Sequence, residues 1–211
     1  MARSLQPVYS LGGPRVVQIV SMKTELPWRQ QPAIADWITS LIEATCEKAE
    51  ATKNVRAQAM DACFGPEASH YFNSKGSAGP EVTFGLSASH ESGATYVAFS
   101  NEAIAIDCCA LDRADEILSA GLIAFSQEEF AMLEVSDRSL VHGWCAVECL
   151  CKLWGAGILQ PNARPRLKGI NPMTAEGTQF GSVGHVHRAQ GKSNACMWAT
   201  RTSSTWKEVA V

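Results

Sequence analysis

Residues 144–158 read Trp-Cys-Ala-Val-Glu-Cys-Leu-Cys-Lys-Leu-Trp-Gly-Ala-Gly-Ile, and this stretch carries the strongest structural signal in the chain. It predicts a helix that stops at the Gly-x-Gly sequence, because glycine adopts the left-handed conformation that ends many helices. Glu148 and Lys152 are four residues apart, so they project from one face of this helix. Such a pair is typical of a surface ion pair and also of metal-assisted phosphoryl transfer, and the rest of the chain has to distinguish the two.

The composition indicates a globular chain. The 211 residues are 46% hydrophobic and 18% charged, which provides enough apolar mass for a core. The formal charge of −3 gives no electrostatic reason to expect nucleic acid as a partner. No apolar run approaches the roughly 20 residues of a membrane span, and residues 1–20 lack the apolar core of a secretory signal. A cytoplasmic protein without a membrane partner is therefore expected.

Eight cysteines are many for this chain, and they stand at positions 46, 63, 108, 109, 145, 149, 151 and 196. A secreted disulfide scaffold would normally be shorter, and the adjacent Cys108 and Cys109 suit an ordinary disulfide poorly. Cys145, Cys149 and Cys151 have no matching second half with zinc-like spacing. We therefore expect mostly reduced, buried thiols, with a thiol-metal site at those three cysteines as the alternative.

The order of the predicted elements is that of an α+β fold. Hydrophobic periodicity predicts the early elements, which are a strand at 14–22, a helix at 33–62 and strands at 82–87, 94–99 and 102–109. Helices follow at 114–120, 126–134 and 140–154, the second opened by a capping box between Ser126 and Glu129. Prolines at 161, 165 and 172 mark an irregular connector, after which strands are expected at 179–187, 196–201 and 206–209.

The strand Ile-Ala-Ile-Asp-Cys-Cys at 104–109 places a carboxylate at the end of an apolar segment. Successive side chains of a strand alternate between its faces. The two sets are Ile104, Ile106 and Cys108 toward the core, and Ala105, Asp107 and Cys109 on the other face. Asp107 is then either the floor of a site or an aspartate that opens the following turn.

The segment Ser-Ala-Ser-His-Glu-Ser-Gly at 87–93 falls between two predicted strands. If residues 88–93 form a turn, backbone N–H groups, the Ser89 hydroxyl and His90 could contact a phosphate. The same composition is also typical of a hairpin connector. Lys75 lies upstream, in a predicted loop at 64–80. His185 and His187 alternate along a predicted strand, and we expect them to be structural because no third metal ligand has suitable spacing.

Taken together and in order, these motifs resemble the 4'-phosphopantetheinyl transferase family, most closely its longer, single-chain branch that activates peptide and polyketide synthases. The motifs are Ser-His-x-x-Gly, Ile-x-Ile-Asp, Phe-Ser-x-x-Glu and Trp-x-x-x-Glu-x-x-x-Lys-x-x-Gly-x-Gly-Ile, within residues 75–158. The resemblance implies two pseudo-symmetric halves, 1–101 and 102–211, each a small antiparallel sheet with a packed helix. It also implies a cofactor cleft between the halves. Two halves in one chain would favour a monomer.

The resemblance further implies a reaction. Family members use Mg²⁺ to move the phosphopantetheine arm of coenzyme A onto a serine of an apo acyl or peptidyl carrier protein, releasing 3',5'-ADP, often in secondary metabolism. By similarity, Asp107 and Glu148 would bind the metal, and Glu148 would also activate the serine. Lys152 would face the pyrophosphate and assist the leaving group. The implied coenzyme A contacts are Lys75, Ser89, His90 and Lys152.

Two positions depart from the family pattern. Cys109 stands where the family usually has a second acid, and a thiol is a soft ligand that suits magnesium poorly. Val147 stands where the family has a lysine directly before the helix glutamate. These departures keep a second interpretation open, in which the chain is a catalytically impaired relative that binds a carrier protein or coenzyme A.

Overall fold

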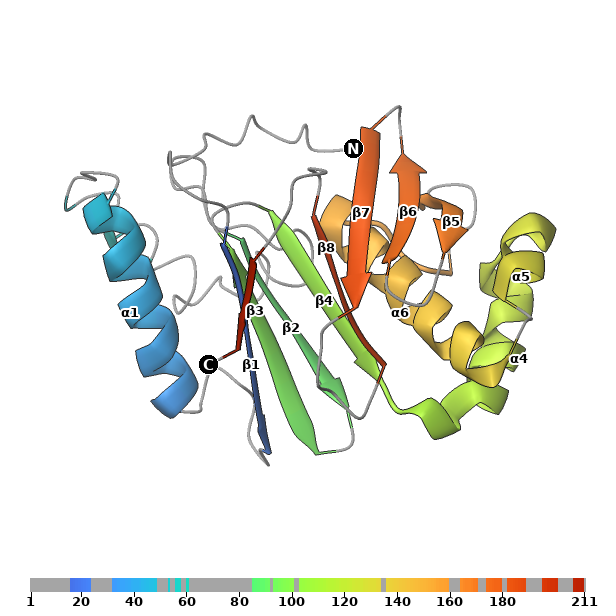
Figure 1. Ribbon diagram of the computed structural model, residues 1–211, viewed down its shortest axis with the longest axis horizontal. Coiled ribbons are helices and arrows are strands. Elements are labelled where there is room, and N and C mark those ends of the chain that lie inside the picture. The colour runs from blue at the N-terminus through green and yellow to red at the C-terminus, as the bar shows by residue number, and fades with distance from the viewer. Residues whose placement is uncertain are drawn as a thin grey trace.

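Two sheets with helices packed beside them form the expected α+β fold (Figure 1). The computed structural model describes residues 16–23, 32–48, 53, 56–57, 60, 85–91, 93–100, 103–133, 136–159, 164–170, 174–179, 182–188, 195–200 and 207–210. The first sheet has the order β2 (Gly85–Glu91), β3 (Ala94–Ser100), β1 (Val16–Lys23), β9 (Lys207–Ala210). The second has the order β4 (Ile104–Cys109), β8 (Ala195–Thr200), β7 (Ser182–Arg188), β6 (Thr174–Gln179), β5 (Arg166–Ile170).

Neighbouring strands run antiparallel in both sheets, with the parallel pair β1–β9 as the exception among the described strands. The boundary predicted near residue 101 falls between β3 and β4, which belong to different sheets. Strand β9 lies at the far end of the sequence and nevertheless joins the first sheet. Among the described strands, the chain thus leaves the first sheet after β3 and returns to it with β9.

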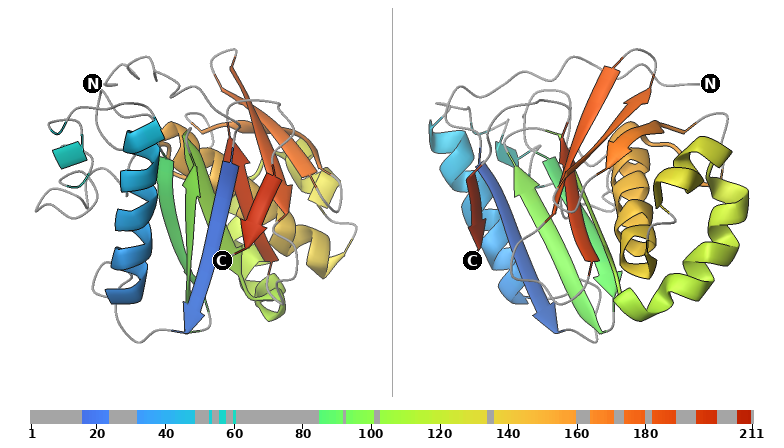
Figure 2. Two further views of the ribbon diagram at one scale, coloured as in Figure 1. Left: turned by 60° about the vertical axis from the view of Figure 1, so that its left-hand side comes forward. Right: turned by 45° about the vertical axis from the view of Figure 1, so that its right-hand side comes forward.

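The helices lie on opposite sides of the molecule (Figures 1 and 2). Helix α1 (Pro32–Lys48) lies beside the first sheet and buries one face, formed by Ile34, Ile38, Ile42 and Cys46. The helices beside the second sheet are η2 (Leu111–Arg113, a short 3-10 helix), α4 (Ala114–Ala124), α5 (Gln127–Leu133) and α6 (Asp137–Trp154). In the described part of the chain, no helix combines the length and the apolar character that a membrane crossing requires.

Strand β4 is buried on both faces, because a separate hydrophobic core lies on each side of it. One face contributes to a core between the two sheets, formed by Ile19, Tyr96, Ala98, Ile104, Ile106, Cys108, Cys196 and Trp198. The other face, with Ala105 and Cys109, contacts a larger core that α4, α5 and α6 cover. The alternation predicted for residues 104–109 is therefore confirmed, with the addition that neither face is open to solvent.

The two sheets meet along β2 and β4, and serine side chains join them there. The backbone N–H of Ile106 donates to Ser87 Oγ at 3.1 Å, and the N–H of Cys108 donates to Ser89 Oγ, also at 3.1 Å. A step of two residues along β2 matches a step of two along β4, so the strands run parallel at this seam. The register of this seam determines which residue of β2 faces Asp107.

The strand predicted to end at residue 87 continues to Glu91, so the predicted turn at 88–93 was wrong. The sequence did not predict the whole strand, because its small, polar side chains show no apolar alternation. Backbone hydrogen bonds to β3 and the serine contacts with β4 stabilise it instead. Ser89 and His90 therefore lie on a strand.

Other boundaries differ too. Helix α6 begins at Asp137 rather than at residue 140, because Ser136 caps it by accepting a hydrogen bond from the N–H of Ser139. Strands β5 and β6 lie largely within the predicted irregular connector, and Pro165 stands directly before β5, where a proline is compatible with a strand start. The predicted helix at 33–62 is described as α1 up to Lys48, and most of its remainder lies outside the described residues.

Candidate functional site

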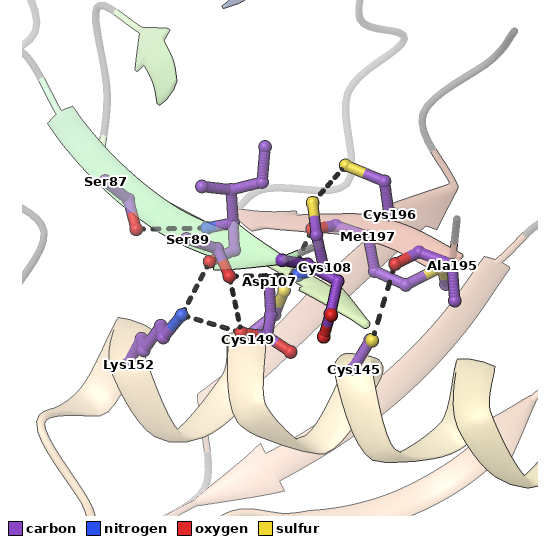
Figure 3. A network of polar contacts seen from close by, with 12 residues as sticks. Ser87, Ser89, Asp107, Cys108, Cys145, Cys149, Lys152, Ala195, Cys196 and Met197 are labelled. Carbon is purple, nitrogen blue, oxygen red and sulfur yellow. Dashed lines mark hydrogen bonds and ion pairs between the residues drawn. The ribbon is translucent and has the colours of Figure 1, made fainter. Parts of the chain in front are cut away.

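Asp107 lies at the centre of a polar cluster between β4, β2 and α6 (Figure 3). Its Oδ1 atom accepts a hydrogen bond from Ser89 Oγ at 3.1 Å and another from Lys152 Nζ at 2.8 Å. Only 9% of Asp107 is exposed, so these contacts form where water screens charge weakly. Among the described residues, no hydrogen bond ends on the second carboxylate oxygen, Oδ2. That oxygen is therefore available to a ligand.

Lys152 holds a positive charge at this cluster. Besides Asp107, its ammonium group donates to the backbone carbonyl of Ile106 at 2.9 Å. Burial by itself would lower the pKa of Lys152, but the surrounding acidic groups, Asp107 foremost, together outweigh burial and raise the pKa to about 12. The side chain is therefore protonated at neutral pH, with its charge fixed beside Asp107.

Glu148 lies one helical turn before Lys152 on α6 and is half-buried. Burial raises the pKa of Glu148, and the negative charge of Asp107 raises it further, whereas Lys152 acts in the opposite direction. Glu148 thus lies within the electrostatic reach of both Asp107 and Lys152. The predicted grouping of Asp107, Glu148 and Lys152 is what the structure shows.

A hard divalent cation fits this donor set. Magnesium prefers oxygen ligands and is usually held by one or two carboxylates together with substrate phosphates. Asp107 Oδ2 and the Glu148 carboxylate are such ligands, and a cation between them would offset the repulsion that raises the pKa of Glu148. Within the described ranges, no three His, Cys, Asp or Glu side chains form a metal cage, so phosphate oxygens would have to complete the shell.

His90 lies at the edge of the cluster. Its side chain is exposed, and Nδ1 is 2.9 Å from Thr95 Oγ1 on the neighbouring strand β3. Partial burial of the ring and then the charge of Lys152 lower the pKa of His90. The ring is therefore neutral at pH 7 and lies within the electrostatic reach of Lys152. Lys75, the remaining predicted contact, lies outside the described residues.

Glu91, at the end of β2, and Arg113, at the end of η2, lie near the last residue of β4. The sequence did not indicate either of them as a site residue. They form an ion pair at 3.2 Å, and Arg113 also pairs with Glu116 at 2.8 Å. Both Glu91 and Arg113 act electrostatically on Cys109. Alternation along β2 could have indicated Glu91, because Ser87, Ser89 and Glu91 lie on one face of the strand. The turn wrongly predicted at 88–93 prevented this inference.

The two departures from the family pattern lie in different surroundings. Cys109 is on the same strand face as Asp107 and is 3% exposed. The neighbouring Cys145 thiol lowers the pKa of Cys109, burial acts against this, and Arg113 lowers the pKa further. Val147 is fully buried in the core covered by α6. A lysine at position 147 would have to bury its charge there, at considerable cost.

The thiols of α6 contact the second sheet. Cys145 Sγ donates to the carbonyl of Ala195 at 3.6 Å, and Cys149 Sγ donates to the carbonyl of Met197 at 3.1 Å. Every cysteine in the described part of the chain is a buried free thiol, as expected. Cys145 and Cys149 therefore pack α6 against β8.

The two histidines of β7 have partners within the second sheet. His185 Nδ1 lies 3.2 Å from a carboxylate oxygen of Glu176 on β6. The ring of His187 stacks on Trp198 of β8, with ring centroids 4.4 Å apart. These contacts fit the structural role expected for both histidines.

The structure thus brings Ser89, Asp107, Glu148 and Lys152 into one cluster, with His90 at its edge. The cluster combines two carboxylates, one fixed ammonium group and a neutral imidazole, a set suited to binding a cation and a phosphate ester. Compared with known proteins, the chain matches no family model and no curated sequence.

Proposed function

We propose that the protein is a Mg²⁺-dependent 4'-phosphopantetheinyl transferase that modifies a serine of an apo acyl or peptidyl carrier protein. The observation that carries the proposal is the convergence of Asp107, Glu148 and Lys152 from β4 and α6. These are the residues to which the motif resemblance assigns metal binding and catalysis. In this proposal the two sheets would correspond to the two halves, and coenzyme A would bind in a cleft between them.

The chain's own side chains account for the main requirements of the reaction. The hydroxyl of the carrier serine attacks the phosphorus that bears the pantetheine arm, and 3',5'-ADP leaves. Glu148 accepts the hydroxyl proton, since its raised pKa brings it closer to the operating pH of a general base. Lys152 keeps its proton and places positive charge where negative charge develops on the leaving phosphate. Magnesium, when bound, would neutralise pyrophosphate charge and orient the phosphates.

Asp107, Ser89 and His90 would prepare the site. Ser89 and Lys152 both bind Oδ1 of Asp107, which would hold the carboxylate in place and leave Oδ2 to bind the cation. His90, neutral and exposed at the edge, would donate to a phosphate oxygen of coenzyme A. Lys75 would add a further phosphate contact. We also propose that the enzyme acts as a cytoplasmic monomer, since one chain supplies both sheets.

The decisive experiment weighs an apo carrier protein after incubation with the full chain, coenzyme A and Mg²⁺. The carrier should gain the mass of one phosphopantetheine group, and omission of Mg²⁺ should prevent the gain. Glu148→Gln should abolish transfer while the protein stays folded. Glu128→Gln, an exposed position on α5, is the matched control and should keep the wild-type rate. No mass gain across several carriers, or full activity of Glu148→Gln, would refute the proposal.

A second candidate function is binding without catalysis, and Cys109 is the observation that favours it. A buried thiol on the same strand face as Asp107 replaces an oxygen ligand with a soft one. In that case coenzyme A would bind with equal affinity with and without Mg²⁺ in calorimetry, and no carrier would be modified. Cys109→Glu should then restore transfer by itself. Position 109 is also buried, but Arg113 acts on it electrostatically and would offset the charge of a carboxylate there. Val147→Lys is less suited to this test, because position 147 is fully buried in the core.

A further inference from the structure

Two cysteines form a close pair on the opposite face of β4 from Asp107. Cys108 of β4 and Cys196 of β8 are directly opposed in the strand register, and their sulfur atoms are 2.6 Å apart (Figure 3). Both belong to the core between the two sheets, where Cys108 is 4% exposed and Cys196 is fully buried. Neither residue takes part in the proposed transfer.

The backbone at this position suits a covalent link. The N–H of Cys108 points away from β8, since it donates to Ser89 Oγ on β2. Cys108 and Cys196 therefore form a non-hydrogen-bonded pair of the antiparallel ladder, in which the Cα atoms lie about 4.5 Å apart. Disulfides join residues whose Cα atoms are roughly 4.4–6.8 Å apart. The two strands can thus accept a bridge here without a change of register.

We propose that Cys108 and Cys196 form a reversible cross-strand disulfide. Cys108, the more exposed of the two, attacks a small disulfide such as oxidised glutathione and releases one glutathione thiol. Cys196 then attacks the mixed disulfide at the Cys108 sulfur and releases the second glutathione. The protein loses two hydrogens, and its two thiols are oxidised while one molecule of oxidised glutathione is reduced to two thiols.

The bridge has a defined consequence for stability. It would join residues 88 positions apart, and closing so long a loop removes much conformational freedom from the unfolded chain. The oxidised protein should therefore unfold several degrees above the reduced protein. Asp107 points to the other face of β4, so this proposal stands or falls independently of the proposed transfer.

The test equilibrates the full chain in buffers of oxidised and reduced glutathione, both as folded protein and during refolding from urea. Refolding exposes the thiols and so removes burial as a kinetic barrier. After alkylation and digestion, mass spectrometry should find residues 108 and 196 cross-linked, with the intact mass lower by two hydrogens. Cys109→Ser, a neighbour on the opposite strand face, should keep the cross-link, while Cys108→Ser should lose it together with the gain in melting temperature.

The proposal would be overturned by any of three results. One is full alkylation of both cysteines in the most oxidising buffer after refolding. Another is a bridge that joins Cys109 to Cys145 instead, and the third is a bridge between chains, seen as dimers on a non-reducing gel. Because mapping of the wild-type protein alone decides between these results and the expected one, the test holds even if Cys108→Ser fails to fold.

Discussion

Ser87 and Ser89 each use a side-chain hydroxyl where a sheet normally uses a backbone carbonyl. Both accept a backbone N–H of β4 at 3.1 Å, and both are buried. Only Ser89 also donates to Asp107. The two serines therefore share one structural role and differ in one contact, which makes them a natural pair for mutagenesis.

Ser89→Ala and Ser87→Ala should each cost about 1–3 kcal/mol of stability, because each leaves a buried N–H without its acceptor. Ser89→Ala should in addition lower the transfer rate roughly 10- to 100-fold, as loss of a group that orients a metal ligand typically does. It should also raise the Mg²⁺ concentration at half-maximal rate. Urea unfolding and carrier-modification assays measure the two effects, and equal losses of activity in both variants would argue against orientation of Asp107 by Ser89.

Glu129 of α5 and Arg164, which precedes β5, form a buried ion pair. The Arg164 side chain is fully buried and the Glu129 side chain is 2% exposed. Arg164 also donates to the carbonyl of Ala124, and Glu129 accepts from the N–H groups of Ser126 and Leu167. Every charge is thus compensated, as burial requires.

Glu129→Gln should destabilise the protein by about 3–5 kcal/mol, since it leaves the Arg164 charge buried without a counter-charge. Urea denaturation at neutral pH measures this difference. Glu128→Gln is the control on the neighbouring exposed position and should lie within about 0.5 kcal/mol of the wild type. Equal stability of all three proteins would mean that the pair contributes nothing.

The same pair predicts a pH dependence. Burial disfavours the charged form of Glu129, but hydrogen bonds from Arg164, Ser126 and Leu167 outweigh it and lower the pKa below the usual 4.5. A lowered pKa in the folded state stabilises the protein above pH 4.5, and this stability is lost as the pH falls through the folded value. Wild type should therefore lose more stability than Glu129→Gln between pH 6 and the acid range, which unfolding midpoints at successive pH values will show.

At the scale of elements, α6 determines how the site is assembled. Ser136 caps its start, and Gly155, with a φ of 67°, ends it. Between these ends, one face supplies Glu148 and Lys152 while other residues pack against the second sheet. Gly184 of β7 lets the helix approach, because a Cβ there would lie 2.6 Å from Trp154 and 2.7 Å from Leu150.

Gly184→Ala should destabilise the protein by roughly 1–3 kcal/mol, as overpacking of a tight contact does. Gly169→Ala, on β5, is the matched control, since a Cβ at that position meets no atom within 4 Å. Thermal unfolding compares the two variants. A melting temperature that falls equally in both would show that the loss comes from the strand backbone and not from the contact with α6.

At the scale of the molecule, β9 ties the end of the described chain to its beginning. It pairs in parallel with β1, at positions Val16 to Ile19, whereas the strands before it in sequence belong to the second sheet. Figure 2 shows β9 at the edge of the first sheet, beside β1. Stability of the first sheet should therefore depend on a distant part of the sequence.

Removal of residues 206–211 should speed amide hydrogen exchange in β1 by roughly tenfold or more, the factor that corresponds to about 1.4 kcal/mol of lost local stability. Exchange in β5 and β6, at the far edge of the other sheet, should change much less and serves as the internal control. Uniform acceleration in both sheets would indicate instead that β9 supports the molecule as a single cooperative unit.

Local patterns in the sequence were enough to predict the α+β class, most of α6, strand β4 with its alternation, and the capping box of Ser126 and Glu129. These features depend on neighbours a few residues apart, so periodicity and spacing reveal them. The grouping of Asp107, Glu148 and Lys152 came from motif order. Strands β5 and β6 were missed because the prolines around them indicated an irregular connector. The continuation of β2 through Ser89 was missed because its small and polar side chains carry no strong period.

Only the tertiary structure decided what those residues contact. It placed Ser89 on the carboxylate of Asp107, buried Val147 away from solvent, and brought Cys108 opposite Cys196. The physical reason is that strand register and helix packing fix contacts between residues tens of positions apart, and no local pattern encodes that register. The sequence by itself determined which chemical groups the chain possesses and which local elements carry them, and the packing of β4 between β2, β8 and α6 determined which of them meet.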